Sequence, residues 1–203
     1  MHMLEVEQRY KITDTDATIK TLKANGLSEA SKQHIIDEWF APLDVQSHER
    51  QREWFDGEHG LAYRVRRVEQ PDGTFIVKVE TKQLTSANDH NTFAETVIDI
   101  SDYDEAHKFL TDKDYWNWLT IDKTRITFAS SDPELEIVLD EIEGLAEKIG
   151  VGAALEIEYK GDADRDAALE KIGAFASMLG LDVSQLFAKS LTVEAMVELA
   201  KFK

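Results

Sequence analysis

The segment Leu4-Glu5-Val6-Glu7-Gln8-Arg9-Tyr10-Lys11-Ile12 decides the fold, because charged and apolar residues alternate along it. In a β-strand, side chains two positions apart project from the same face. One face of this segment is charged and carries Glu5, Glu7, Arg9 and Lys11. The other face carries Val6, Tyr10 and Ile12. This period of two predicts a strand with one charged and one apolar face.

Seven further segments show strand signals of the same kind. They cover residues 31–40, 61–68, 74–82, 92–100, 118–129, 134–141 and 152–160. The sequence Gln70-Pro71-Asp72-Gly73 is a strong turn signal and joins the third and fourth strands as a hairpin. Eight mostly antiparallel strands can close into a barrel, and closure removes exposed sheet edges. We therefore expect an eight-stranded antiparallel β-barrel.

Helix signals lie at four places between and after these strands. Asp14 or Thr15 can cap a helix over 16–24, and Ser101 with Asp104 resembles a capping box for a helix over 104–110. Two more helices, over about 163–179 and 192–201, carry apolar stripes that predict packing against the barrel. No linker, repeat or low-complexity tract appears. The prediction is one α+β domain over 1–203, with barrel strands at about 4–160 and C-terminal helices at about 163–201.

Composition excludes several classes of protein. The 203 residues contain no cysteine, which removes disulfide scaffolds, thiol nucleophiles and cysteine-ligated metals and suits a cytoplasmic location. With 23 Lys and Arg against 40 Asp and Glu, the formal charge is −17, so nucleic acid and anionic membranes are not expected partners. No apolar run approaches the ~20 residues that a membrane-spanning helix needs.

Charged residues recur in closely spaced pairs within the predicted strands. The basic pairs are Arg64 with Arg66, Lys78 with Lys82, and Lys123 with Arg125. The acidic pairs are Glu5 with Glu7, and Glu156 with Glu158. On one strand such a face would simply meet water. On a closed barrel, faces of this kind from several strands can all point into the lumen.

A lumen lined in this way suits a polyphosphate that carries a divalent metal. Carboxylates are hard oxygen ligands for Mg²⁺ or Mn²⁺. Arginine offers two-pronged hydrogen bonding to phosphate oxygens, and lysine offers point charge. Phosphoryl transfer needs mainly positioning and charge stabilisation, so a nucleophilic side chain is not required. The sequence contains no GxxxxGK[ST] phosphate loop.

Several of these segments resemble motifs of one family. Glu5-Val6-Glu7-Gln8-Arg9 resembles the ExExK signature of the CYTH superfamily, the triphosphate tunnel metalloenzymes, with arginine in place of the usual lysine. Tyr63-Arg64-Val65-Arg66 resembles the RxR strand of that family, and Lys123-Thr124-Arg125 its KxR strand. The resemblance continues in the second strand of the family at residues 34–40 and in its strand with an inward lysine at 75–78. Residues 139–145 followed by 155–158 resemble its LDxxxGLG…EIE segment, and residues 189–190 resemble its late KS motif.

The resemblance implies roles for particular residues. The metal, Mg²⁺ or Mn²⁺, would be held by Glu5, Glu7, Asp140, Glu156 and Glu158. The catalytic group would comprise Glu5, Glu7, Arg9 and Asp140. The phosphates would be contacted by Arg9, Arg64, Arg66, Lys78, Lys123, Arg125 and Lys189. Glu80 and Glu95 would pair with basic side chains of the lumen, whereas Lys11 and Lys82 could face either the lumen or the surface.

Three functions stay open at this point. The first is a metal-dependent hydrolase of inorganic or small organic triphosphates. The second is a class IV adenylyl cyclase that converts ATP to cyclic AMP and pyrophosphate, and the third is a barrel that binds polyphosphate or nucleotide without turnover. The expected partner is a triphosphate-containing small molecule, and a homodimer is left open. Trp39 and Phe40 are predicted core residues, and no function is predicted for His34 or His90.

Overall fold

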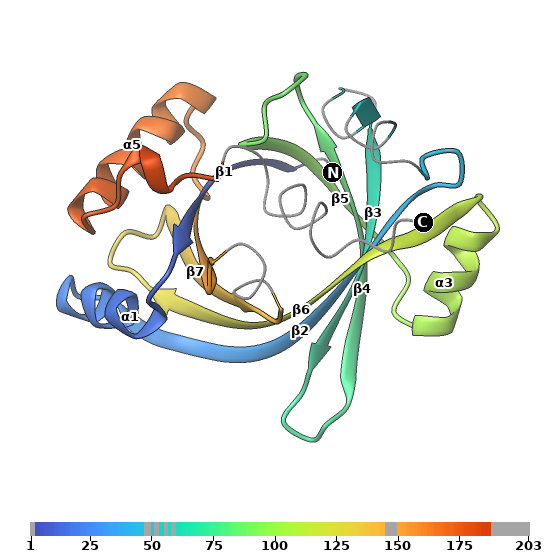
Figure 1. The fold of residues 1–203 in the computed structure, drawn as a ribbon, viewed down its shortest axis with the longest axis horizontal. Helices are drawn as coiled ribbons and strands as arrows, with labels where there is room; N and C mark the ends of the chain where they lie inside the picture. The colour runs from blue at the N-terminus through green and yellow to red at the C-terminus, as the bar shows by residue number, and fades with distance from the viewer. Residues whose placement is uncertain are drawn as a thin grey trace.

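The computed structural model describes residues 3–46, 50, 53–54, 57, 60–144 and 150–187. Eight antiparallel strands close into a barrel in the order β1-β5-β4-β3-β2-β6-β7-β8, as predicted (Figure 1). Their bounds are β1 Met3–Ile12, β2 Ser28–Pro42, β3 Leu61–Glu69, β4 Phe75–Leu84, β5 Thr92–Ile98, β6 Tyr115–Ala129, β7 Leu135–Ile142 and β8 Ala153–Tyr159.

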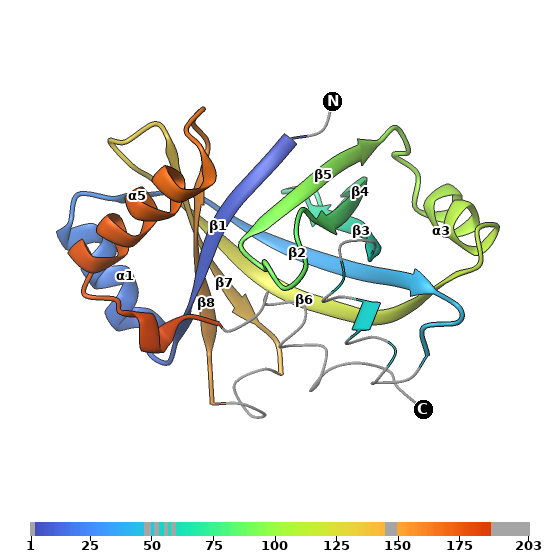
Figure 2. The same cartoon turned by 90° about the horizontal axis from the view of Figure 1, so that it is seen from above.

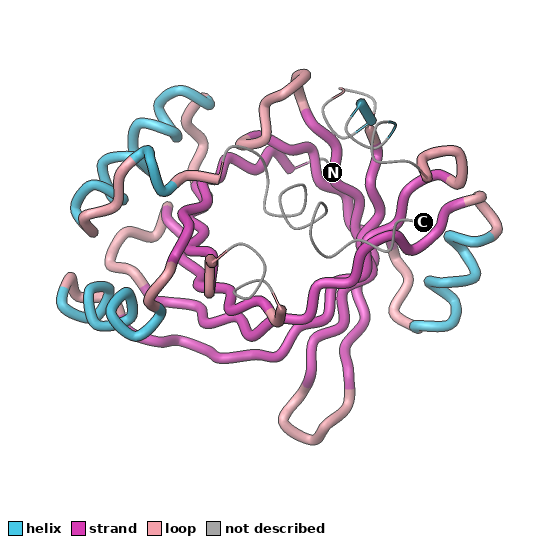
Figure 3. The backbone as a smooth tube through the Cα atoms, in the orientation of Figure 1, coloured by secondary structure: helices cyan, strands magenta, loops and turns pink. Residues whose placement is uncertain are grey.

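The helices lie outside the ring of strands (Figure 2, Figure 3). They are α1 Thr15–Ala24, α3 Tyr103–Thr111, α5 Arg165–Met178 and the short 3-10 helix η1 Val183–Gln185. Asp14 caps α1 as predicted, because its side chain accepts from the Ala17 amide. The cap predicted at Ser101 is wrong: Asp102 is the extended residue, and it accepts from the Glu105 amide. The helix predicted over 192–201 lies outside the described residues.

The strands β2 and β6 are longer than their sequence patterns predict. β2 starts at Ser28 and β6 at Tyr115, each three residues before the predicted start. The two strands pair with each other from Ser28 opposite Ala129 to Pro42 opposite Tyr115. The first six residues of β2 are exposed. Backbone hydrogen bonds in this ladder therefore extend both strands into segments that are not buried. Alternation of apolar and polar residues does not mark such segments in the sequence.

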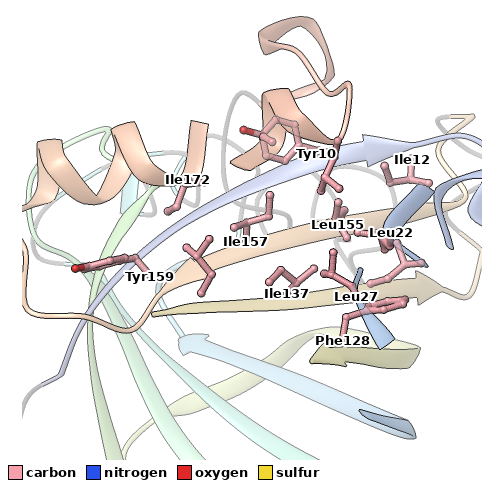
Figure 4. Packing of buried hydrophobic residues seen from close by; sticks show 14 of the residues in the cluster. Tyr10, Ile12, Leu22, Leu27, Phe128, Ile137, Leu155, Ile157, Tyr159 and Ile172 are labelled. Carbon is pink, nitrogen blue, oxygen red and sulfur yellow. The ribbon is translucent and has the colours of Figure 1, made fainter. Parts of the chain in front are cut away.

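The largest hydrophobic cluster lies outside the barrel wall, between the strands and the helices (Figure 4). Tyr10 and Ile12 of β1 meet Leu155 and Ile157 of β8 there, and Ile172 of α5 packs over them. A second cluster places α3 against the outer faces of β3 and β4. Buried apolar side chains thus occupy the outward faces of these strands. This placement leaves the alternating charged positions to point into the barrel.

His34 links three strands from the face of β2 opposite to that of Asp37. Its Nδ1 lies 2.7 Å from Glu69 Oε2 on β3, and its Nε2 lies 2.7 Å from Asp122 Oδ1 on β6. The hydrogen bonds to Glu69 and Asp122 raise the pKa of His34 above its ordinary value of 6.5. The folded state therefore binds a proton more tightly than the unfolded state does.

The resulting stabilisation is complete below about pH 6.5 and is lost as the pH rises through the raised pKa of the folded protein. At pH 6, we expect the unfolding free energy of the wild type to be higher than that of His34→Gln. The difference should be about 1 kcal/mol or less, because solvent screens this partly exposed site. The difference should vanish at pH 9. Urea unfolding of both proteins at the two pH values measures this difference in unfolding free energy. An equal pH dependence of stability in both proteins would contradict a raised pKa of His34.

Candidate active site

A cavity of about 200 Å³ lies inside the barrel and is open to solvent. In the described part of the chain, eight carboxylates and seven cations line it. The carboxylates are Glu5, Asp37, Glu80, Glu95, Glu136, Asp140, Glu156 and Glu158. The cations are Arg9, Arg64, Arg66, Lys82, Lys123, Arg125 and Lys160. The lumen is therefore close to neutral, because carboxylates and cations line it in nearly equal numbers.

Most of the predicted site residues meet in this cavity, but two of those that the structure describes, Glu7 and Lys78, do not line it. Glu7 is only 1% exposed and lies in the wall beside Arg9. Lys78 is exposed and lies outside the cavity lining, although it shares a strand face with Glu80 and Lys82. It sits near the β3–β4 hairpin, which extends away from the ring in Figure 1. Lys189 lies outside the described residues.

Each lumen arginine is held by carboxylates along one edge of its guanidinium group. Arg66 donates from Nε and Nη2 to Asp37, at 2.6 and 2.7 Å. Arg125 donates from the same two atoms to Asp140, both at 2.7 Å. These two-pronged contacts fix the position and the plane of each group.

Arg64 and Arg9 follow the same pattern. Arg64 donates from Nε to Glu80 at 2.9 Å and from Nη2 to Glu80 and Glu95. Arg9 donates from Nε to Glu156 at 2.7 Å, and its Nη2 lies 2.6 Å from Glu7 Oε1. Among the described residues, none of the carboxylate contacts of these four arginines uses Nη1. An anion in the lumen can therefore be bound without breaking the contacts that orient the arginines.

The lumen lysines join the same network. Lys82 Nζ lies 2.6 Å from Glu5, and Lys123 Nζ lies 2.7 Å from Asp140. Lys160 Nζ contacts Glu158 at 2.6 Å and Glu136 at 2.9 Å, and no role is predicted for this lysine from its sequence context. Lys82 thus faces the lumen. Burial, followed by the nearby Arg125, lowers the pKa of Lys123.

Carboxylates around β1 and β8 differ in protonation behaviour. Burial raises the pKa of Glu158 to about 7, with help from Glu5 and Glu156. Burial and a hydrogen bond shared with Glu5 raise the pKa of Glu95 to about 7. For Glu5, burial acts upward, but Lys82 and its hydrogen bonds outweigh it and lower the pKa to about 2. Burial also raises the pKa of Glu7.

Glu7 and Glu158 form a buried pair of carboxylates in one part of the wall. Glu7 and Glu158 stand directly opposite each other in the β1–β8 ladder, and Glu7 Oε1 lies 2.6 Å from Arg9 Nη2. Both side chains supply the hard oxygen donors that Mg²⁺ and Mn²⁺ prefer. The donor set therefore fits a divalent cation at Glu7 and Glu158, with Glu5 and Glu156 adjacent.

As described, however, these carboxylates are engaged with cations. No group of three or more His, Asp or Glu side chains in the described residues is arranged to enclose a metal ion. Both oxygens of Asp140 are taken by Lys123 and Arg125, and the residue is only 1% exposed. The arrangement favours Asp140 as a partner of the cations rather than as a metal ligand.

Sequence reasoning missed several residues that line the cavity. Asp37 and Lys160 share lumen parity with Trp39 and Glu158, so strand periodicity could have marked them. His90 was predicted to be an ordinary loop residue, yet it is 7% exposed and lines the cavity together with Phe93. No local sequence signal places a loop histidine there. Trp39 and Phe40 are buried as predicted, and Trp39 also lines the cavity.

Comparison with family models and with curated proteins gives no match. Solved structures do match. The PH1819 protein of Pyrococcus horikoshii is 19% identical, with a TM-score of 0.72 over 96% of this chain and 99% of that chain. A Vibrio parahaemolyticus protein described as a candidate adenylate cyclase is 19% identical, with a TM-score of 0.68 over 97% of this chain and 99% of that chain.

A third structure is a Hippeastrum protein assigned as an adenylyl cyclase and described as having a dominant triphosphatase activity. It is 13% identical, with a TM-score of 0.55 over 89% of each chain. The chain shares the eight-stranded barrel architecture of these solved structures, as expected from its resemblance to the CYTH superfamily. At these identities the likeness establishes the architecture and not the chemistry of the cavity. No helix in the described ranges has the length and apolar character needed to cross a membrane.

Proposed function

We propose that this protein is a divalent-metal-dependent hydrolase of triphosphates that acts inside the barrel. One observation carries the proposal. Four arginines from β1, β3 and β6 line one cavity, and each is oriented by carboxylates on its Nε and Nη2 edge. The remaining guanidinium donors suit an elongated anion with several oxygens. An inorganic or small organic triphosphate is such an anion.

The cavity residues have distinct tasks in this proposal. Arg9, Arg64, Arg66, Lys123 and Arg125 bind the phosphoryl oxygens and stabilise charge on the leaving diphosphate. Water attacks the terminal phosphorus, the bond to the bridging oxygen breaks, and diphosphate leaves. The attacking water must lose a proton, and Glu95, with its pKa of about 7, is suited to accept it near neutral pH.

A divalent cation is part of the proposal. Glu7 and Glu158, joined by Glu5 and Glu156, would hold Mg²⁺ or Mn²⁺, which supplies charge neutralisation and polarisation of phosphoryl oxygens when bound. A triphosphate that reaches a lumen of nearly balanced charge brings several negative charges of its own. The cation held by these carboxylates would offset part of the negative charge of the triphosphate. It would thereby lower the electrostatic cost of binding this anion in the lumen.

The test is to incubate purified protein with Mg²⁺ or Mn²⁺ and, separately, with tripolyphosphate, thiamine triphosphate or ATP. We expect orthophosphate from tripolyphosphate or from an organic triphosphate, and none when EDTA is present. Arg67→Ala serves as a control for the loss of an arginine outside the cavity and should keep the wild-type activity. Arg67 contacts Glu38 and Tyr103 and does not line the cavity. Absence of hydrolysis with every substrate, despite tight binding, would leave only a binding function.

A second candidate is adenylyl cyclase activity, in which the 3′-hydroxyl of ATP attacks the α-phosphorus and releases pyrophosphate. The observation that favours it is the apolar part of the cavity lining, where Trp39 and Phe93 lie with Leu84, Ile121 and Ala62. Aromatic side chains can pack against an organic group attached to the phosphates. Cyclic AMP and pyrophosphate as products from ATP would support this candidate over hydrolysis.

A further inference from the structure

Asp37 is a cavity carboxylate that contacts two of the cations assigned to phosphate binding, Arg66 and Lys123. It lies in the middle of β2, lines the cavity and is only 2% exposed. β2 runs between β3 and β6 in the barrel, so Asp37 has a cationic strand on each side (Figure 1). The metal and phosphate roles proposed above do not include it.

Its two oxygens contact cations from both neighbouring strands. Oδ1 accepts from Arg66 Nε at 2.6 Å, and Oδ2 accepts from Arg66 Nη2 at 2.7 Å. Oδ2 also lies 3.3 Å from Lys123 Nζ. Arg66 and Lys123 would repel each other in this buried wall without a carboxylate between them. Asp37 therefore fixes both their separation and the plane of the guanidinium group.

The contacts continue through the next carboxylate. Lys123 also contacts Asp140, which in turn holds Arg125. Cations and anions thus alternate from Arg66 through Asp37, Lys123 and Asp140 to Arg125, across β3, β2, β6 and β7. Arg66 and Lys123 outweigh the effect of burial and hold the pKa of Asp37 well below its usual range, so the carboxylate stays charged at neutral pH.

We propose that Asp37 is a positioning residue that holds Arg66 and Lys123 at the spacing needed to meet neighbouring phosphoryl groups of a triphosphate. The inference rests on the proposed hydrolase function. Replacing Asp37 by asparagine keeps its shape but removes the charge that orders both cations. The lumen then carries one negative charge fewer, so attraction of an anion does not weaken, whereas the alignment needed for reaction is lost.

The experiment measures kcat and KM for tripolyphosphate with Mg²⁺ in Asp37→Asn. A misplacement of about 1 Å can lower a rate about 100-fold, and we expect a loss of kcat of that order with KM unchanged or lower. The matched control is Asp122→Asn, the same substitution on the adjacent strand, where the carboxylate contacts His34 and does not line the cavity. It should retain the wild-type kcat.

A double-mutant cycle then tests whether Asp37 acts through the cations. In an Arg66→Ala background, the addition of Asp37→Asn should lower kcat by no more than about 3-fold, because the closer partner of Asp37 is already gone and Lys123 keeps its contact with Asp140. Fully additive losses, or a normal kcat in Asp37→Asn, would overturn the proposal. If Asp37→Asn does not fold, Asp37→Glu keeps the charge but displaces it by one methylene. A loss of at least about 10-fold is then expected, and a wild-type kcat overturns the proposal.

The wild-type protein separates this inference from the proposed function. If wild type and Asp122→Asn hydrolyse a triphosphate while Asp37→Asn does so equally well, only the role of Asp37 fails. If wild type hydrolyses none of the triphosphates, the hydrolase proposal fails, and the positioning role falls with it.

Discussion

Glu7→Gln should lose metal-dependent hydrolysis while keeping its fold. The side chain is only 1% exposed, stands opposite Glu158 in the β1–β8 ladder and contacts Arg9 at 2.6 Å. Glutamine keeps the shape but cannot supply an anionic metal ligand. We expect turnover of tripolyphosphate to fall about 100- to 1,000-fold, since a metal ion contributes several kcal/mol to the stabilisation of the transition state.

A second readout for Glu7→Gln does not depend on activity. A ligand that binds only the folded protein raises its thermal midpoint. Wild type should therefore gain thermal stability on addition of Mg²⁺ or Mn²⁺, and Glu7→Gln should gain little. The matched control is Glu136→Gln, since Glu136 lines the cavity but contacts Lys160 and is 42% exposed. An undiminished metal-induced shift in Glu7→Gln would rule out Glu7 as a ligand.

Arg125→Ala should weaken both triphosphate binding and the fold. Arg125 donates two hydrogen bonds to Asp140, whose carboxylate is only 1% exposed and is left with Lys123 alone after the substitution. Removal of one partner of a buried ion pair lowers the unfolding free energy by about 3–5 kcal/mol. We expect a loss near the lower value, because Lys123 still contacts Asp140. Binding of tripolyphosphate should weaken about 10- to 100-fold through the loss of charge-assisted hydrogen bonds.

The double variant Arg125→Ala/Asp140→Asn separates these two effects. Neutralising Asp140 removes the uncompensated buried charge, so part of the unfolding free energy should return. Binding should stay weak, because the cation that contacts the phosphates is still missing. Urea unfolding and calorimetric titration with tripolyphosphate in EDTA measure the two quantities. If binding recovered together with stability, Arg125 would be a structural residue and not a ligand contact.

Local sequence patterns predicted the strands well, because a period of two is set within each segment. The hairpin at 70–73 is one example: Gly73 has a φ of 81°, and its amide donates to the Gln70 carbonyl at 2.9 Å. The pattern was weaker at strand ends. Lys78 shares the strand face of Lys82, yet it falls outside the cavity because β4 continues beyond the ring there. Periodicity specifies a face and does not specify how far along a strand the barrel extends.

The sequence by itself determined that the chain forms eight strands, several of which carry paired charges on one face. It also determined that these charges include carboxylates and arginines suited to a metal and a triphosphate. It did not determine which carboxylate holds which cation. Lys82 meets Glu5 across 77 positions of sequence, and Arg9 meets Glu156 across 147. These contacts arise because closure of the barrel places β1 between β5 and β8. Strand order and register depend on packing between distant segments, so only the tertiary structure decided that the lumen is an ordered and nearly neutral ion-pair network.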